Sequence, residues 1–310
     1  MAQIAFLFAG QGAQYPGMGK ELYAVSPAAR RVFDACEAMR AGTLAQCFEG
    51  SAEELSSTIN TQPCLFAMDY ACAAALEEAG IRADYAAGFS LCEVAAAAFC
   101  GLLSLEDAFG LVCRRAELMA AAGEKRPGAM SAILKLPAEK VQELCGKYSD
   151  VFPVNYNCPG QTVVSGQEEQ LAALEQEAAA AGGRAMRLKV SGSFHSPYMQ
   201  EASEGLAEYM AGLTFAAPRI PLYSNATAEP YTAERAAALL AQQVKSPVLW
   251  QKSMEALRKE GCEIFLEVGA GKTLTGLMRK IDGSAAACNI ESPETLQKAL
   301  SMLKGEENGK

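Results

Sequence analysis

Histidine is nearly absent from this 310-residue sequence: His195 is the only one, and none of the eleven cysteines belongs to a CxxC pair. Zinc sites are usually built from closely spaced cysteines and histidines, so the sequence predicts no metal site. The cysteines lie scattered through apolar, helix-like segments of a long chain without a secretion signal. We therefore expect reduced thiols rather than disulfides.

Positive charge is also scarce, because 27 lysines and arginines face 36 aspartates and glutamates, which gives a net charge of -9. This balance argues against nonspecific nucleic-acid binding. An anionic ligand would need a local basic patch, and five residues could form one: Lys125, Arg126, Arg184, Arg187 and Lys189. The alternative is that these five are solvated surface charges.

The sequence has no apolar run long enough to cross a bilayer, and its N-terminus has neither a basic region nor a signal-cleavage pattern. We expect no membrane association and a cytoplasmic location. For a chain of this length, one large domain with an insertion and two separate domains are the natural alternatives.

Strands and helices alternate along most of the chain. Residues 3–9 and 263–268 are short, largely apolar segments that predict buried strands. Residues 85–88 predict a brief central strand, followed by a helix over residues 91–100. Such an alternation predicts a mostly parallel sheet between helices.

Two helix starts carry clear signals. Ser26 precedes Pro27, which places a serine at the N-cap and a proline at the first helical position. The same reasoning starts a second helix at Thr61, with Pro63 in its first turn and Gly80 as its stop.

The pattern changes between residues 127 and 191, where the predicted order is strand, helix, strand, strand, helix, strand. That order is typical of the ferredoxin-like βαββαβ unit. We therefore predict an α/β core formed by residues 1–126 and 192–310, with an inserted ferredoxin-like subdomain formed by residues 127–191.

Ser90 stands in the segment AAGFSLCEVA, between a short predicted strand and an alanine-rich predicted helix. A nucleophile elbow needs this arrangement, and its usual pattern G-x-S-x-G supplies glycines that let strand and helix approach closely. Gly88 fills the first glycine position, but Cys92 fills the second. Two interpretations stay open: a nucleophile on a strand-to-helix turn, and a serine that caps a buried helix.

A serine nucleophile needs a neighbouring base, most often histidine. His195 lies in the segment SGSFHSPYM, directly after the last predicted strand of the insertion. The chain order, Ser90 before His195, is that of the α/β hydrolases. The alternative is a loop histidine that bonds only to backbone, and the sequence identifies no acidic partner for the ring.

Two glycine-rich segments are candidates for ligand sites. Residues 10–14 follow the first predicted strand and could bring backbone amides to a developing oxyanion, or form a plain tight turn. They are not a dinucleotide fingerprint, because Tyr15 takes the third glycine position. The segment VGAGKTLTG is not a phosphate-binding loop, because Leu266 stands where the first glycine is needed.

Arg114 and Arg115 are adjacent on a predicted helix whose other positions are largely apolar. A planar guanidinium in such surroundings suits bidentate pairing with a carboxylate. Successive helical residues point about 100 degrees apart, so at most one of the two can face a cleft squarely. Two solvated arginines are the alternative.

Together these features resemble the malonyl-CoA:acyl carrier protein transacylases of fatty-acid and polyketide synthesis. The resemblance covers nearly the whole chain and rests on eight short matches in register: FLFAGQGAQYPGMG, GFSLCEVAA, RRAELM followed by GAMSAIL, VNYNCPGQTVVSG, SFHSPYM, PLYSNATA, QQVKSPVLW and FLEVGAGKTLTGL. It implies a large hydrolase-like core with a ferredoxin-like insertion, which agrees with the order of elements predicted above.

The resemblance also implies roles for eight residues: Ser90 as acylated nucleophile, His195 as general base, Gln11 and the backbone N–H of Leu91 as oxyanion hole, Arg115 as partner of the malonyl carboxylate, and Gln243, Asn157 and Phe194 as residues that line the site. Gln243 would also support the histidine. Phe194 resembles the bulky residue by which malonyl-selective relatives exclude an α-methyl branch.

The implied activity is transfer of a malonyl group from malonyl-CoA to the phosphopantetheine thiol of acyl carrier protein, through an acyl-serine intermediate and with ping-pong kinetics. The implied partners are malonyl-CoA and acyl carrier protein. No metal or redox cofactor, nucleic acid or membrane is expected. The sequence leaves open the pathway, fatty-acid or polyketide, the carrier protein and the oligomeric state.

The sequence departs from the family pattern G-H-S-L-G-E at two positions, with Phe89 in place of the histidine and Cys92 in place of the second glycine. These changes leave the rate and the acyl selectivity open. Two alternatives therefore stand beside a transferase: a thioester hydrolase on the same scaffold, and a homologue that binds acyl carrier protein or CoA without turnover.

Overall fold

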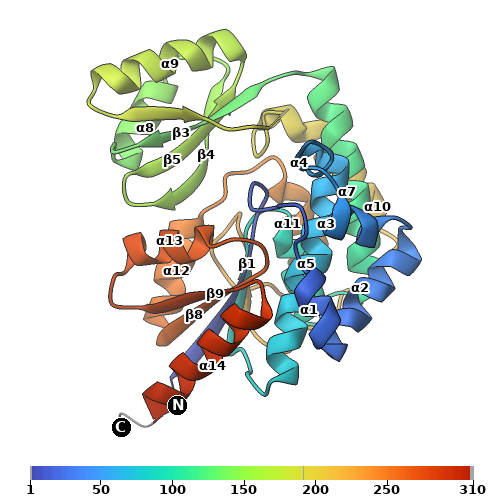
Figure 1. Cartoon of the computed structure of the whole chain (residues 1–310). Coiled ribbons are helices and arrows are strands. Elements are labelled where there is room, and N and C mark those ends of the chain that lie inside the picture. The colour runs from blue at the N-terminus through green and yellow to red at the C-terminus, as the bar shows by residue number, and fades with distance from the viewer. Residues whose placement is uncertain (1, 191, 308–310) are drawn as a thin grey trace.

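The computed structural model describes residues 2–190 and 192–307, and Figure 1 shows how the elements are arranged. The core is built on five parallel strands: β1 Gln3–Phe8, β2 Tyr85–Gly88, β7 Leu222–Tyr223, β8 Cys262–Val268 and β9 Ala286–Ile290. Their order in the sheet is β7-β2-β1-β8-β9. The predicted mixed α/β fold with a parallel sheet is confirmed.

The apolar run of β1 explains its place at the centre of this sheet. Phe6 and Phe8 pack into the larger hydrophobic core on one face, and Ala5 and Leu7 pack into a second core on the other face. All four side chains are fully buried. Parallel sheets are normally covered on both faces in this way.

Helices cover both faces of the sheet. The larger core lies against α2 Pro27–Met39, α5 Thr58–Glu78, α6 Cys92–Phe99 and α7 Leu105–Lys125, and the second core lies against α12 Trp250–Lys259 and α13 Thr273–Ile281. The other helices outside the insertion are α1 Lys20–Val25, α3 Thr43–Glu49, α4 Ala52–Ser56, the short 3-10 helix Pro197–Met199, α10 Gln200–Met210, α11 Ala233–Gln243 and α14 Pro293–Glu307.

One of the two predicted helix starts is confirmed and the other is wrong. At the start of α2 a serine caps the helix and a proline takes its first position, as predicted. The predicted start at Thr61 is wrong, because α5 begins at Thr58 and Pro63 lies inside it. The carbonyl oxygen of Ser57 accepts a hydrogen bond from the Thr61 N–H, so the helix is already formed before the proline.

The insertion forms a second, antiparallel sheet. Its elements are β3 Ala129–Leu134, α8 Ala138–Cys145, β4 Val151–Cys158, β5 Gln161–Gly166, α9 Glu168–Ala180 and β6 Arg184–Arg187. The strand order is β4-β5-β3-β6 with antiparallel neighbours, as in the ferredoxin-like fold that the element order predicted. We call residues 129–187 the small subdomain.

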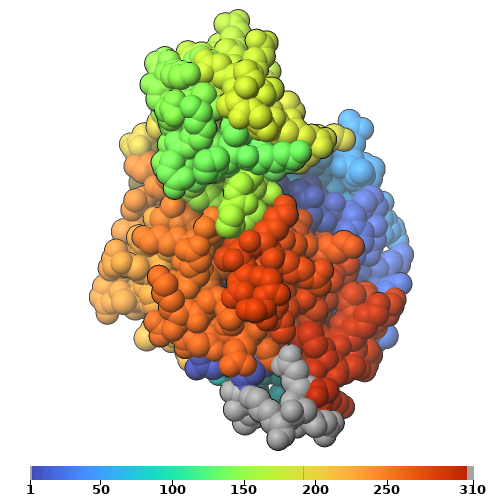
Figure 2. Space-filling model, turned by 90° about the vertical axis from the view of Figure 1, so that its left-hand side faces the viewer, coloured from blue at the N-terminus to red at the C-terminus, as the bar shows by residue number. Residues whose placement is uncertain are grey.

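The small subdomain has a hydrophobic core of its own, and in Figure 2 its green and yellow residues form a lobe at the top of the molecule. Strand β4 joins it to the core, because the Val248 N–H donates to Val154 O and the Tyr156 N–H donates to Val248 O. The division of the chain after residues 126 and 191 stays a prediction, and residue 191 lies outside the described residues.

Candidate active site

Ser90 lies on a sharp turn between β2 and α6. Its φ angle of 56° is in the left-handed region, which residues other than glycine rarely adopt. The turn brings α6 so close to Gly88 that a Cβ there would lie 2.2 Å from the carbonyl oxygen of Cys92, so only glycine fits. The N-cap of α6 is Leu91, not Ser90. The geometry is that of a nucleophile elbow, and the helix-cap interpretation is wrong.

Ser90 is paired with His195. Ser90 Oγ lies 2.7 Å from Nε2 of His195, and Nδ1 of the same ring lies 3.0 Å from the backbone carbonyl oxygen of Gln243. Because a carbonyl only accepts, Nδ1 carries the proton and Nε2 is free to accept from the Ser90 hydroxyl. The histidine therefore does not bond only to backbone, and a carbonyl takes the orienting role that an acidic residue has in other triads.

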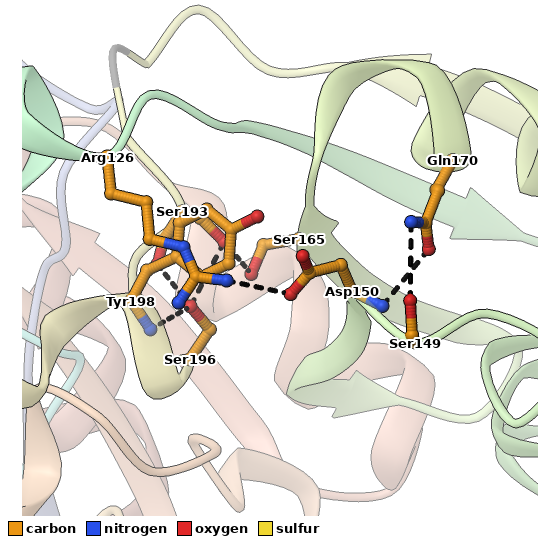
Figure 3. Close-up of polar contacts among 8 residues, drawn as sticks. All are labelled: Arg126, Ser149, Asp150, Ser165, Gln170, Ser193, Ser196 and Tyr198. Atoms are coloured by element: carbon orange, nitrogen blue, oxygen red, sulfur yellow. Dashed lines mark hydrogen bonds and ion pairs between the residues drawn. The ribbon is translucent and has the colours of Figure 1, made fainter.

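Buried serines and an arginine hold the loop that carries His195 (Figure 3). Ser193 Oγ donates to Ser165 Oγ of β5 at 2.9 Å. Three residues after the histidine, the Tyr198 ring lies under the guanidinium of Arg126, with 3.6 Å between Cζ and the ring centroid. These contacts join the loop to the small subdomain and to the end of α7, so both help to fix the histidine.

The environment keeps His195 neutral. Burial lowers the pKa of its ring to about 4, and the positive charge of Arg115 acts in the same direction. At pH 7 the ring is therefore the uncharged imidazole, which is the form that can accept a proton from a hydroxyl.

Arg115 is the second charged group of the site. It is buried on α7, where Nη1 donates to Gln62 Oε1 at 2.7 Å and Nη2 donates to Gln243 Oε1 at 2.9 Å. Nη2 also lies 3.3 Å from Ser90 Oγ. Arg114 points away and pairs with a carboxylate on the surface. Of the two adjacent arginines, Arg115 faces the site, as the resemblance implied.

Burial lowers the pKa of Arg115 to about 10, so the guanidinium is charged at pH 7. Its hydrogen-bond partners, Gln62, Gln243 and Ser90, are all neutral. A buried positive charge without a carboxylate against it is suited to receive one from a substrate.

The turn after β1 lies against the elbow. A Cβ at Gly10 would stand 2.7 Å from the Phe89 ring, so the backbone beside Gln11 approaches the turn that carries Ser90. Within the described part of the chain, the backbone N–H groups of Gln11 and Leu91 donate no hydrogen bond. Two free amides beside a nucleophile are what an oxyanion hole requires, and this supports the role implied for both residues.

Comparisons with known proteins agree with this geometry. The sequence model of the acyl transferase domain family matches residues 5–293. The chain is 40% identical to the malonyl CoA-acyl carrier protein transacylase of Bacillus subtilis (strain 168), over 99% of each chain. The chain belongs to the malonyl CoA-acyl carrier protein transacylase family.

Solved structures give the same result. The malonyl CoA-acyl carrier protein transacylase of Clostridium perfringens superposes with a TM-score of 0.95 at 34% identity, covering 99% of this chain and 98% of that one. A malonyl-transacylase in complex with its type II polyketide synthase acyl-carrier protein gives 0.92 at 32% identity, covering 97% and 99%. This transacylase is therefore an acyltransferase.

Phe89 and Cys92, the two residues that depart from the family pattern, both pack against neighbouring side chains or backbone. The Phe89 ring stands edge-on to the ring of Trp250, with 5.2 Å between centroids, and lies over Gly10. Cys92 is fully buried in the larger core. The elbow thus keeps its shape with a phenylalanine and a cysteine in these positions.

Phe194 and Asn157 are buried, as expected of residues that line a closed site. The Phe194 ring packs in the larger core, and the backbone oxygen of Phe194 accepts a hydrogen bond from Ser165. Asn157 lies on β4, and its Oδ1 accepts no hydrogen bond among the described residues. No hydrogen bond between described residues joins either side chain to Ser90 or His195, so their roles stay predictions.

Four polar residues that hold the site were not predicted from the sequence: Gln62, Glu93, Asn225 and Tyr231. Asn225 is the clearest case, because its Oδ1 accepts from the Ser90 N–H at 2.7 Å and its Nδ2 donates to Gly88 O at 2.6 Å. It therefore fixes the elbow from both sides. Asn225 lies in the matched segment PLYSNATA, but nothing in that segment indicates that it reaches a serine 135 residues away.

The predicted basic patch is largely neutralised. Lys125 pairs with Glu201, Arg126 with Asp150, and Arg187 with both Glu168 and Glu175. The two remaining members, Arg184 and Lys189, are exposed. Surface ion pairs of this kind leave little net positive charge to attract an anionic partner.

Among residues 2–190 and 192–307, no three histidine, cysteine, aspartate or glutamate side chains are grouped so that they could hold a metal ion. In the same residues, no helix combines the length and the apolar character that crossing a membrane requires.

The low pKa of His195 makes a prediction. Because the ring must be neutral to take the Ser90 proton, the final loss of malonylation rate on acidification should centre near pH 4. Replacing Arg115 with methionine removes a charge that lowers this pKa, so the same loss should move to higher pH. The malonylation rate of both proteins, measured from about pH 3.5 to 8, tests this, and the same profile with acetyl-CoA, which has no carboxylate, excludes titration of the malonyl group as the cause.

The quantity to compare is the pH at which each protein loses its activity, not the absolute rate. A complete loss centred near pH 6.5, the ordinary pKa of a histidine, would contradict the assigned environment of His195.

Proposed function

We propose that this chain transfers a malonyl group from malonyl-CoA to the phosphopantetheine thiol of acyl carrier protein, through an ester on Ser90. The observation that carries the proposal is that Ser90 Oγ lies 2.7 Å from a neutral imidazole nitrogen and 3.3 Å from the guanidinium of Arg115. One atom is thus placed to attack a carbonyl while a neighbouring charge holds a carboxylate. The names of the relatives support malonyl-CoA and acyl carrier protein as partners.

In the first half-reaction, Nε2 of His195 takes the proton of the Ser90 hydroxyl as Oγ attacks the thioester carbonyl. The developing oxyanion would be held by the N–H groups of Gln11 and Leu91. When the intermediate collapses, the carbon–sulfur bond breaks, and His195 returns the proton to the CoA sulfur. Arg115 holds the malonyl carboxylate throughout.

In the second half-reaction, His195 takes the proton of the phosphopantetheine thiol, and the sulfur attacks the ester carbonyl. The bond between that carbon and Ser90 Oγ breaks, and the proton passes from His195 back to the serine. CoA leaves before the carrier protein reacts, so the kinetics should be ping-pong. We expect no metal or redox cofactor, because one histidine suffices for both proton transfers.

A role in fatty-acid or polyketide synthesis follows from this activity. Because these pathways use soluble carrier proteins, we expect the protein to be located in the cytoplasm.

The experiment that tests the proposal separates transfer from the two alternatives, hydrolysis and binding without turnover. The protein is mixed with malonyl-CoA, and intact mass and CoA release are followed with and without acyl carrier protein. A stable malonyl adduct that passes to the carrier protein supports transfer. Continuous release of CoA without the carrier protein would instead indicate a hydrolase, and no adduct at all would indicate a binding protein.

Arg115 should set the preference for a charged acyl group. Replacing Arg115 with methionine should lower kcat/KM for malonyl-CoA by at least about thirty-fold, the lower end of what losing one partner of a buried charge pair costs. The value for acetyl-CoA, which has no carboxylate, should fall much less. Initial rates with the two substrates measure this difference.

Arg114 offers the matched control, because it is adjacent in sequence but pairs with Glu117 on the surface. Replacing Arg114 with methionine should leave both values within about twofold, as for most surface changes. Equal losses for malonyl and acetyl substrates in the Arg115 variant would show that Arg115 supports the fold rather than the carboxylate.

A further inference from the structure

Glu93 is a buried acid that the proposed mechanism does not use. It lies on α6, three residues after Ser90, and is fully buried. Its Oε1 accepts from the Asn225 N–H at 3.0 Å and from the Tyr231 hydroxyl at 2.5 Å. Its Oε2 accepts from Gln243 Nε2 at 2.6 Å. Only an ionised carboxylate can accept from three donors without presenting a proton of its own.

Gln243 connects Glu93 to Ser90, His195 and Arg115 through hydrogen bonds. Its Nε2 donates both to Glu93 and to the backbone oxygen of Ser90, at 2.6 Å each. This leaves Oε1 facing Arg115, while the backbone oxygen of Gln243 orients His195. If the amide turned over, its NH2 group would meet the guanidinium, and two donors would face each other. The carboxylate therefore selects the amide orientation that the site needs.

Asn225 forms a second path from the same carboxylate. Its backbone N–H is held by Glu93, and its side chain accepts from the Ser90 N–H and donates to Gly88 O. Glu93 thus holds the elbow through Asn225 and the base and the arginine through Gln243. A buried network in which every member has a partner fixes geometry well.

The negative charge of Glu93 also acts on the positive charge of Arg115. The charged or titratable groups that face it are Arg115 and Tyr231, and the positive charge of Arg115 favours its ionised form. The two charges are separated by the amide of Gln243 rather than bonded directly. A direct ion pair would occupy the guanidinium. Because Gln243 stands between the two charges, Glu93 balances the buried charge of Arg115, and the hydrogen-bond partners of the guanidinium remain the neutral groups of Gln62, Gln243 and Ser90.

We propose that Glu93 is a positioning residue for acyl transfer, whose buried carboxylate orients Gln243 and Asn225 and balances the charge of Arg115 without occupying it. The inference rests on the proposed function. Burial raises the pKa of Glu93 to about 7, so near neutral pH a fraction of the molecules should carry a protonated, uncharged Glu93.

The test is the pH dependence of the malonylation rate. When the pH is lowered through about 7, Glu93 becomes protonated, and the wild-type rate should fall by about tenfold in one step. This factor corresponds to the loss of one hydrogen bond to a charged group. This step is separate from the final loss due to His195. Glu93→Gln keeps the shape but not the charge, so at pH 8 it should be about tenfold slower and should show no step between about pH 5 and 8.

Tyr231→Phe is the second variant. It leaves the carboxylate in place but removes a hydrogen bond that lowers the pKa of Glu93, so the step should move to higher pH. A step caused by a phosphate of CoA would persist unchanged in all three proteins. If Glu93→Gln does not fold, as judged by its thermal unfolding, the shift in Tyr231→Phe decides the question alone.

A wild-type rate at pH 8 in Glu93→Gln, a step that persists in that variant, or a step unmoved in Tyr231→Phe would overturn the inference. Absence of malonyl transfer by the wild type at every pH would instead overturn the proposed function. The two failures are therefore distinguishable.

Discussion

Replacing Ser90 with alanine should lower the rate of malonyl transfer by about a million-fold, the scale seen when a serine nucleophile is removed from a comparable site. The reason is chemical, because the Ser90 hydroxyl is the side-chain oxygen that is hydrogen-bonded to His195 Nε2 and attacks the thioester. The rate at which acyl carrier protein gains a malonyl group, followed by mass, measures the loss.

Ser203 provides a matched control for this change. It is also buried, and its Oγ donates to the backbone oxygen of Ala241, away from the elbow. Ser203→Ala should cost some stability, about 1 kcal/mol for a lost hydrogen bond, but leave the transfer rate within a few-fold. A comparable rate loss in both variants would mean that Ser90 matters for the fold and not for the chemistry.

Replacing His195 with alanine should cause a loss of similar size, because the same ring moves the proton in both half-reactions. Removing both members of such a pair costs about as much as removing one. The Ser90→Ala, His195→Ala double variant should therefore be no slower than the slower single variant, within a few-fold. Additive losses would show that the two residues act independently, which a hydrogen bond of 2.7 Å between them does not allow.

The fold was largely predictable where the apolar pattern is strong. β1 and β8 are largely apolar segments, and in the small subdomain the hydrophobic residues repeat at different intervals in the helices and in the strands. β9 was missed because its sequence, AACNI, is short and mostly half-buried. Strand β7 is only two residues long, and its place in the sheet depends on pairing with β2.

The start of α5 was mispredicted for a different reason. Pro63 normally indicates a first turn, but the Ser57 carbonyl begins the helix earlier, and a proline within it leaves only the Ile59 carbonyl without its usual N–H. The local sequence pattern therefore predicted the helix correctly but placed its start three residues too late.

The active site could be predicted only in part from the residues. Ser90 alone fitted a helix cap as well as a nucleophile, and His195 was suggested as its partner because it is the only histidine and follows Ser90 in the chain order of the hydrolases. The structure adds that Leu91 is the N-cap and that Ser90 and His195, 105 residues apart, share a hydrogen bond. Glu93 and Asn225 could not be predicted, because a buried network is defined by which distant side chains meet.

The measurement that tests the central claim most directly is the location of the malonyl group after reaction with malonyl-CoA. Trypsin should release residues 83–114 as one peptide, which carries Ser90 together with Ser104 and three cysteines. Fragmentation mass spectrometry should place one malonyl group on Ser90, and the group should disappear when acyl carrier protein is added. A malonyl group on Cys92 or another residue, or one that persists in Ser90→Ala, would contradict this account.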